Sequence, residues 1–230
     1  MSTKYKPILF KGEMVRAILE GRKTQTRRLV KPQPTVSKFS GMVPSHDVKW
    51  ARMYDLTDIP NQPIIQDIPV PWKVGDILYV RETWGRYGRY DQIIPHEGHF
   101  EGDMCWKQLS DKIHFYADGE DPAPPNEQKI MIGGKWHKMP SLFLKKKDAR
   151  IFLEVVNVRV ERLMDISIED AKAEGITEYG EGFGKEGDDL WRNNTSVENY
   201  FWLWDKINGA GSHKENCWVW VIEFERCEKP

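Results

Sequence analysis

The sequence lacks the features that mark disulfide-stabilised, zinc-binding, secreted and membrane-spanning proteins. Only three cysteines occur among 230 residues, and no two of them form a C-x-x-C pair, so we predict reduced thiols and neither a disulfide framework nor a zinc knuckle. The longest apolar runs, residues 200–204 and 218–222, are far shorter than the roughly 18 residues that a membrane span needs. Residues 7–10 are too short for the apolar core of a signal peptide. We therefore expect a cytoplasmic protein without a membrane partner.

The chain also lacks an excess of charge of either sign. It has 34 Lys and Arg against 35 Asp and Glu, a net charge of −1, which excludes a uniformly basic nucleic-acid coat but allows a local basic patch. Residues 22–31 hold five cations and no acid. Arginine and threonine side chains suit anionic or polar ligands, and a solvated basic loop is the alternative interpretation. Lys145–Lys147 with Arg150 is a secondary candidate for phosphate contact.

Metal-binding patterns are weak. His96 and His99, with Asp103 and Cys105 nearby, have loose ligand spacing and no fourth ligand at a recognisable interval, so we predict no metal and no cofactor. Several tryptophans lie outside clean periodicity and are candidates for base stacking, although packing under long loops is the more common role of such residues: Trp84, Trp106, Trp136 and Trp191.

Hydrophobic periodicity and capping residues predict the regular elements. Within one predicted strand the apolar phase shifts at Val156–Asn157, which indicates a β-bulge. Ser167 and Ser196 are the expected N-caps of the last two helices. Strands are expected at residues 5–10, 77–82, 113–116, 151–160 and 218–225, and helices at 13–20, 168–174 and 196–208.

These helices do not alternate regularly with the strands, so a doubly wound parallel sheet is not expected. The predicted fold class is α+β, a small mixed β-barrel with packed helices and a long insertion, in a single domain over residues 1–230. Proline, glycine and charge are dense in two regions without periodicity. We interpret them as an irregular connection at about 32–71 and an insertion at about 85–147.

Four segments of the chain, in order, resemble the signatures of the ASCH domain: Gly21–Arg28 (GRKTQTRR), Gly75–Val80 (GDILYV), Ala171–Gly175 (AKAEG) and Val219–Phe224 (VWVIEF). This family belongs to the PUA-like superfamily of small β-barrels, so the resemblance implies a PUA-like barrel. Lys6–Phe10 and Tyr79–Trp84 are similar to a longer subgroup often seen in phage and prophage genomes. Residues at about 85–147 have no counterpart in the minimal domain.

The resemblance also implies a ligand and a reaction. It implies binding of RNA, a nucleoside or a modified base. The family pattern G-x-K-x-x-E-x-R has an acid where this chain has Thr26, a departure shared with short ASCH enzymes that hydrolyse N4-acetylcytidine. Their proposed catalytic residues fall here on Lys23, Thr26 and Glu174. In such a metal-independent amidohydrolase Thr26 attacks, Lys23 takes its proton, and Glu174 shuttles the proton to the leaving nitrogen.

Two other functions stay open, a non-catalytic reader of RNA or modified bases and a ribonuclease. On a regular strand Lys23 and Thr26 point to opposite faces, so catalysis by both requires a turn or bulge between them. Glu174 stands beside a helix C-terminus, where the helix dipole disfavours an anion. The expected ligand-binding residues are Arg22, Thr24, Arg27, Arg28, Arg81 and Trp84.

Overall fold

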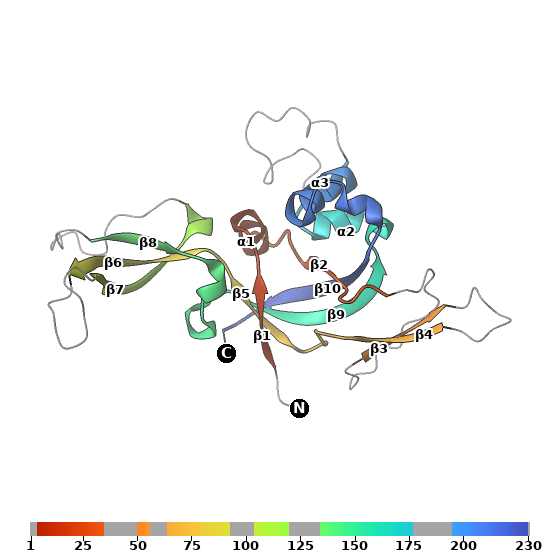
Figure 1. Cartoon of the computed structure of the whole chain (residues 1–230), viewed down its shortest axis with the longest axis horizontal. Helices are drawn as coiled ribbons and strands as arrows, with labels where there is room; N and C mark the ends of the chain where they lie inside the picture. The colour runs from red at the N-terminus through yellow and green to blue at the C-terminus, as the bar shows by residue number, and fades with distance from the viewer. Residues whose placement is uncertain are drawn as a thin grey trace. The chain divides into compact units, whose positions relative to one another are not determined.

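The structure is a computed structural model that describes residues 4–34, 50–55, 64–92, 104–119, 134–176 and 195–229. The chain divides into two compact units (Figure 1). Three of their four boundaries fall within β1 (Tyr5–Leu9), α1 (Gly12–Leu19) and β5 (Ile77–Arg81), and the fourth lies just before the strand that begins at Phe152. Unit 1 consists of residues 1–6, 17–78 and 151–230, and unit 2 of residues 7–16 and 79–150.

A five-stranded sheet with the order β1-β5-β9-β10-β2 includes the three antiparallel strands of unit 1, β9 (Phe152–Arg162), β10 (Trp218–Cys227) and β2 (Gln25–Leu29). Residues 218–222 of β10, an interior strand between β9 and β2, are buried on both faces. Aromatic and β-branched side chains fill these positions, as suits a strand covered on both sides. Within the described residues β1 and β2 are the sheet edges, and the strands form no closed barrel. The predicted α+β class is confirmed.

Strand β9 contains a bulge at Val156. Asn157 lies opposite Glu223 and Val155 lies opposite Phe224, so Val156 is an extra residue between them. The side chain of Val156 is accordingly 41% exposed, while Val155 is buried. The bulge therefore lets one strand satisfy two apolar phases, as the sequence predicts.

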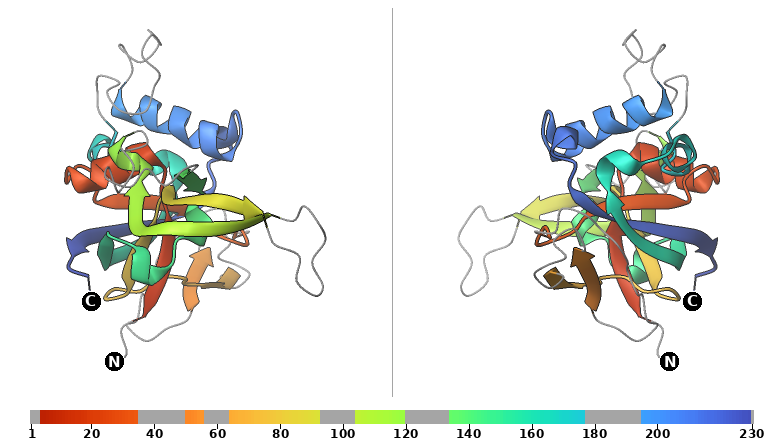
Figure 2. Two further views of the ribbon diagram at one scale, coloured as in Figure 1. Left: turned by 90° about the vertical axis from the view of Figure 1, so that its left-hand side faces the viewer. Right: turned by 90° about the vertical axis from the view of Figure 1, so that its right-hand side faces the viewer.

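Two helices, α2 (Ile168–Ala173) and α3 (Ser196–Asn208), lie over one face of this sheet (Figure 1 and Figure 2). Ser167 caps α2 as predicted, because its hydroxyl accepts a hydrogen bond from the backbone of the third helical residue. The N-cap of α3 is Thr195 and not Ser196. Thr195 and Glu198 form a reciprocal capping box, which the sequence analysis missed by one position.

A separate antiparallel pair, β3 (Trp50–Asp55) and β4 (Ile64–Pro69), lies in the region predicted to be an irregular connection. Proline had argued against strands there. Pro69, however, ends β4 in a sheet of only two strands, a position where the missing N–H of proline is tolerated.

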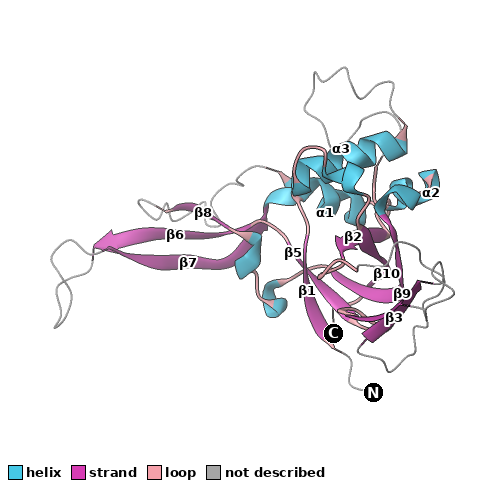
Figure 3. Cartoon of the chain, turned by 45° about the vertical axis from the view of Figure 1, so that its right-hand side comes forward, coloured by secondary structure: helices cyan, strands magenta, loops and turns pink. Residues whose placement is uncertain are grey.

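Unit 2 is built on a three-stranded antiparallel sheet of β6 (Trp84–Gln92), β7 (Met104–Phe115) and β8 (Lys135–Met139), with β6 in the centre (Figure 3). The strand predicted at 113–116 is the end of β7. Trp84, Tyr87 and Leu144 are buried in this unit, so the region predicted as an insertion has apolar packing of its own.

The described residues also contain short 3-10 helical turns. They are Tyr116–Asp118, η2 (Ser141–Phe143) and η3 (Lys146–Asp148) in unit 2, and Leu163–Asp165 and Ser212–Glu215 in unit 1. None of the helices in the described ranges is long and apolar enough to cross a membrane.

Candidate functional site

The backbone brings Lys23 and Glu174 together although 151 residues separate them. After α1, the Lys23 N–H donates to the carbonyl of Ala17 at 3.0 Å. The N–H of Thr24 then donates to the carbonyl of Ala173, at the end of α2, at 2.9 Å. Lys23 and Glu174 consequently pair as an isolated antiparallel bridge, which holds the two residues side by side in unit 1.

Gly175 makes this close approach possible. Its φ is +91°, in the region that favours glycine at the end of a helix. A Cβ at this position would lie 3.0 Å from Ala17 Cβ and 3.2 Å from Lys23 Cβ. The glycine that follows the predicted helix at 168–174 therefore also allows Lys23 to pack against the chain.

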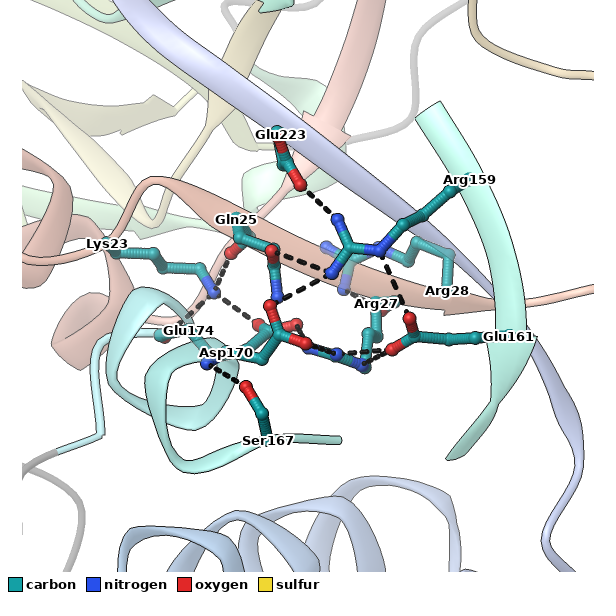
Figure 4. A network of polar contacts seen from close by, with 10 residues as sticks. All are labelled: Lys23, Gln25, Arg27, Arg28, Arg159, Glu161, Ser167, Asp170, Glu174 and Glu223. Carbon is teal, nitrogen blue, oxygen red and sulfur yellow. Dashed lines mark hydrogen bonds and ion pairs between the residues drawn. The ribbon is translucent and has the colours of Figure 1, made fainter. Parts of the chain in front are cut away.

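The ammonium group of Lys23 is completely enclosed. Its side chain is 0% exposed, and Nζ donates to Glu174 Oε2 at 2.7 Å, to the Glu174 carbonyl at 2.9 Å and to the Gln25 carbonyl at 2.8 Å (Figure 4). A protonated lysine has three donors, and these three oxygens match them. Burial lowers the pKa of Lys23. The positive charges of Arg28 and Arg27 also lower it, and Glu174 opposes these effects.

Arg27 lies among carboxylates instead of facing an open ligand site. Its side chain is fully buried; Nη2 donates to Asp170 Oδ2 at 2.9 Å, Nε to Glu161 Oε1 at 3.1 Å, and Nη1 approaches Glu174 Oε1 at 3.4 Å. Burial opposes the charge, but Glu174, Tyr200 and Glu161 hold the pKa of Arg27 above its ordinary value. A phosphate would have to displace these carboxylates, so Arg27 is a counter-ion in this structure.

Arg159 extends the same network across the sheet (Figure 4). It donates to Asp170 Oδ1 at 2.9 Å and Glu161 Oε2 at 3.1 Å, and it pairs with Glu223. Burial alone would raise the pKa of Asp170, yet Arg27 and Arg159 outweigh it and the pKa is lowered. The sequence analysis missed Arg159 and these three acids. The pairing that brings them together exists only in the folded sheet, where Arg27 and Arg159 both lie opposite Val221 of β10.

Thr26 lies on the other side of β2. It is opposite Ile222, whereas Arg27 is opposite Val221, and successive side chains of a strand point to opposite faces. The pairing of β2 with β10 is regular from Gln25 onward, so this strand supplies no bulge. Within the described residues no hydrogen bond joins the buried Thr26 hydroxyl to Lys23 or Glu174. The structure therefore brings together two of the three predicted catalytic residues.

The other predicted ligand-binding residues of unit 1 differ in exposure. Arg22 and Thr24 are exposed and Arg28 is half-buried. Arg22 pairs with Glu20 and donates to the Gly175 carbonyl at 3.0 Å. Arg28 donates to the Arg27 carbonyl at 3.2 Å, and burial lowers its pKa against the effect of Glu174. Arg22 and Thr24 thus border the Lys23 site with exposed polar groups.

Arg81 and Trp84 belong to unit 2. Arg81 is half-buried and donates to the Tyr79 hydroxyl at 3.1 Å. Trp84 is 4% exposed, its Nε1 donates to the Pro140 carbonyl at 3.3 Å, and the Arg86 guanidinium lies 4.9 Å from its ring. Base stacking on Trp84 would require this ring to be uncovered.

The remaining aromatic and metal candidates are only partly described. Trp136 is half-buried and packs edge-on against Tyr87. In the part of the chain that the structure describes, no three His, Cys, Asp or Glu side chains are grouped to hold a metal ion. His96, His99, Asp103, Trp191 and the side chains of Cys105 and Trp106 lie outside the described residues.

No family model matches the sequence, and neither the curated proteins nor the solved structures contain a match to the chain. The chemistry of the site consequently rests on its own residues.

Proposed function

We propose that unit 1 is an ASCH-type, PUA-like domain that binds RNA, a nucleoside or a modified base and hydrolyses the N4-amide of an acylated cytidine. The observation that carries this proposal is the fully buried Lys23 ammonium, 2.7 Å from the Glu174 carboxylate. A buried lysine with a lowered pKa gives up its proton more readily than a solvated one. A perturbed titratable pair of this kind suits proton transfer.

In the proposed reaction neutral Lys23 removes the proton of the attacking oxygen, which becomes bonded to the acyl carbon. Lys23 passes this proton to Glu174, which delivers it to N4, and the carbon–nitrogen bond breaks to release cytidine. The attacking oxygen is that of Thr26 in the reaction that the ASCH resemblance implies. The acyl group passes first to Thr26 and then to water, so acetate and cytidine are the products.

The test is incubation of the purified protein with N4-acetylcytidine in the presence of EDTA, with cytidine and acetate quantified by chromatography. We expect Lys23→Met, Glu174→Gln and Thr26→Val each to abolish turnover, and the combined losses not to add, because the residues act as one unit. Lys206→Met is the matched control, since Lys206 is exposed on α3 and should leave turnover unchanged. Equal turnover by wild type and Lys23→Met would overturn the assignment.

A non-catalytic reader is the second candidate, and one observation favours it. Lys23 Nζ already has three oxygen acceptors and the Thr26 hydroxyl is not hydrogen-bonded to it, an arrangement that also suits a purely structural ion pair. Retention of N4-acetylcytidine without hydrolysis would support the reader and remove the enzyme. Cleavage of labelled single-stranded RNA in the same buffer would instead indicate the ribonuclease.

A further inference from the structure

A second surface with binding chemistry lies in unit 2, between β8 and the end of the unit. Residues 134–150 contain six cations and a single acid. Within this stretch, Leu142, Phe143 and Lys145–Lys147 are all exposed, the first two at 57% and 59%. We propose that these five side chains, which we call the Leu-Phe-Lys turn, bind single-stranded RNA.

The backbone holds this turn in one shape. In η2 the N–H of Leu144 donates to the Ser141 carbonyl at 3.1 Å, and in η3 the N–H of Asp148 donates to the Lys145 carbonyl at 2.9 Å. Leu144 and Ala149 are buried and anchor the two turns from within. Because Leu144 and Ala149 are buried while Leu142, Phe143 and Lys145–Lys147 are exposed, the apolar pair and the lysines are directed outward before any ligand arrives.

Neighbouring groups of unit 2 contact the start of the turn at Pro140 and pair with Asp148 and Arg150 at its end. The carbonyl of Pro140 accepts from Trp84 Nε1 at 3.3 Å, and the Asp148 carboxylate lies 3.5 Å from the Arg86 guanidinium. Arg150 donates to Glu82 Oε1 at 2.9 Å and to Asp118 Oδ2 at 2.6 Å. Arg150, grouped with the lysines in the sequence analysis, is therefore a structural residue and lies outside the binding surface.

The composition of the turn matches single-stranded RNA. Such strands bind where an aromatic ring stacks with a base and cations follow the phosphates. Here Phe143 and the three lysines lie within five residues, with only Leu144 between them. The fixed backbone reduces the ordering cost of binding. An anionic lipid surface is the competing occupant, but polybasic lipid sites typically use about four to eight cations, whereas this turn presents one aromatic ring and three lysines.

This inference rests on the proposed function in one respect, since it takes RNA as the class of ligand. We would measure the affinity for a fluorescein-labelled oligouridylate of about 12 nucleotides, a length within the usual range of site sizes, by anisotropy at several salt concentrations. Phe143→Ala should weaken binding roughly 5- to 100-fold through lost stacking. Replacing Lys145–Lys147 by Gln should lower the salt slope by about 2.

Lys112→Gln is the matched control, because Lys112 is also exposed in unit 2 but lies outside the turn. It should change the affinity little. Wild-type-like RNA binding by both turn variants would overturn the inference, as would failure of the wild type to bind the oligonucleotide. The wild type could instead bind vesicles of equal parts phosphatidylserine and phosphatidylcholine but no RNA, with the turn variants losing the vesicle binding. That result would assign the turn to membranes and would also overturn the inference.

Hydrolysis of free N4-acetylcytidine separates this inference from the proposed function. The turn variants should hydrolyse the nucleoside as the wild type does. If neither the wild type nor the turn variants hydrolyse the nucleoside but the variants still lose RNA affinity, the proposed enzyme fails and the RNA surface stands. If hydrolysis is normal and RNA affinity is unchanged in the variants, the RNA surface fails and the enzyme stands.

Discussion

Replacing Lys23 by methionine removes one charge of a buried ion pair and keeps the length of the side chain. Removal of one partner from such a pair typically costs about 3–5 kcal/mol, because the other charge is left buried. Here Arg27 remains 3.4 Å from Glu174 and still neutralises part of that charge. The carbonyls of Gln25 and Glu174 lose their lysine donor, which adds a desolvation penalty. We therefore expect a loss of about 3 kcal/mol.

The assay is urea unfolding followed by tryptophan fluorescence, with the loss read from the midpoint at constant slope. In a chain of this size about 3 kcal/mol corresponds to a melting temperature roughly 6–12 °C lower. The double variant Lys23→Met/Glu174→Met should recover much of the stability, since apolar replacement of a whole buried pair is often neutral. A single-variant loss below about 1 kcal/mol, the range of exposed pairs, would refute the reasoning.

Three further predictions concern the buried residues and the glycine turns of unit 1. Burial lowers the pKa of Lys23 below 10.5 in the folded state, so between the folded and the unfolded pKa the unfolded state binds more protons. The free energy of unfolding of the wild type relative to Lys23→Met should therefore rise with pH through that window. Urea titrations in which this difference stays flat or falls would contradict the prediction. Gly175→Ala should be destabilising by about 1–3 kcal/mol, and by more than Gly211→Ala, which also has a positive φ but no atom within 4 Å of an added Cβ; equal melting shifts would show that the contact with Lys23 is unimportant. Trp220 and Trp204 are both buried, so truncating either to Ala should cost about 3–5 kcal/mol in the same urea assay, and an unchanged midpoint would count against the described core.

Local patterns in the sequence predicted the main sheet of unit 1 well. The apolar runs of β9 and β10 are long, and the phase shift at Val156 is visible because a strand has a period of two. The β3–β4 pair and the β6–β8 sheet were harder to predict, because their residues lack clean alternation. Their pairing depends on partners distant in sequence, such as Trp84 opposite Met139, which periodicity does not encode.

At the candidate site, the sequence identified residues better than it identified their roles. Lys23 and Glu174 were selected by motif, and they lie in contact. Arg27 was expected to face a ligand because it stands in an acid-free segment, but that segment is acid-free only along the chain. In the fold Asp170 and Glu161 arrive from α2 and β9, so the local charge is balanced by residues more than a hundred positions away.

The position of Arg27 has a consequence for the chemistry proposed for Lys23. A buried ammonium that loses its proton normally leaves its carboxylate partner unpaired, at a high desolvation cost. Glu174 has a second cation, because Arg27 Nη1 approaches the oxygen that Lys23 does not occupy. Arg27 stays protonated under all ordinary conditions, so the carboxylate keeps a counter-ion while Lys23 is neutral. The network therefore permits a neutral lysine beside an ionised glutamate, which is the state that a base at this position requires.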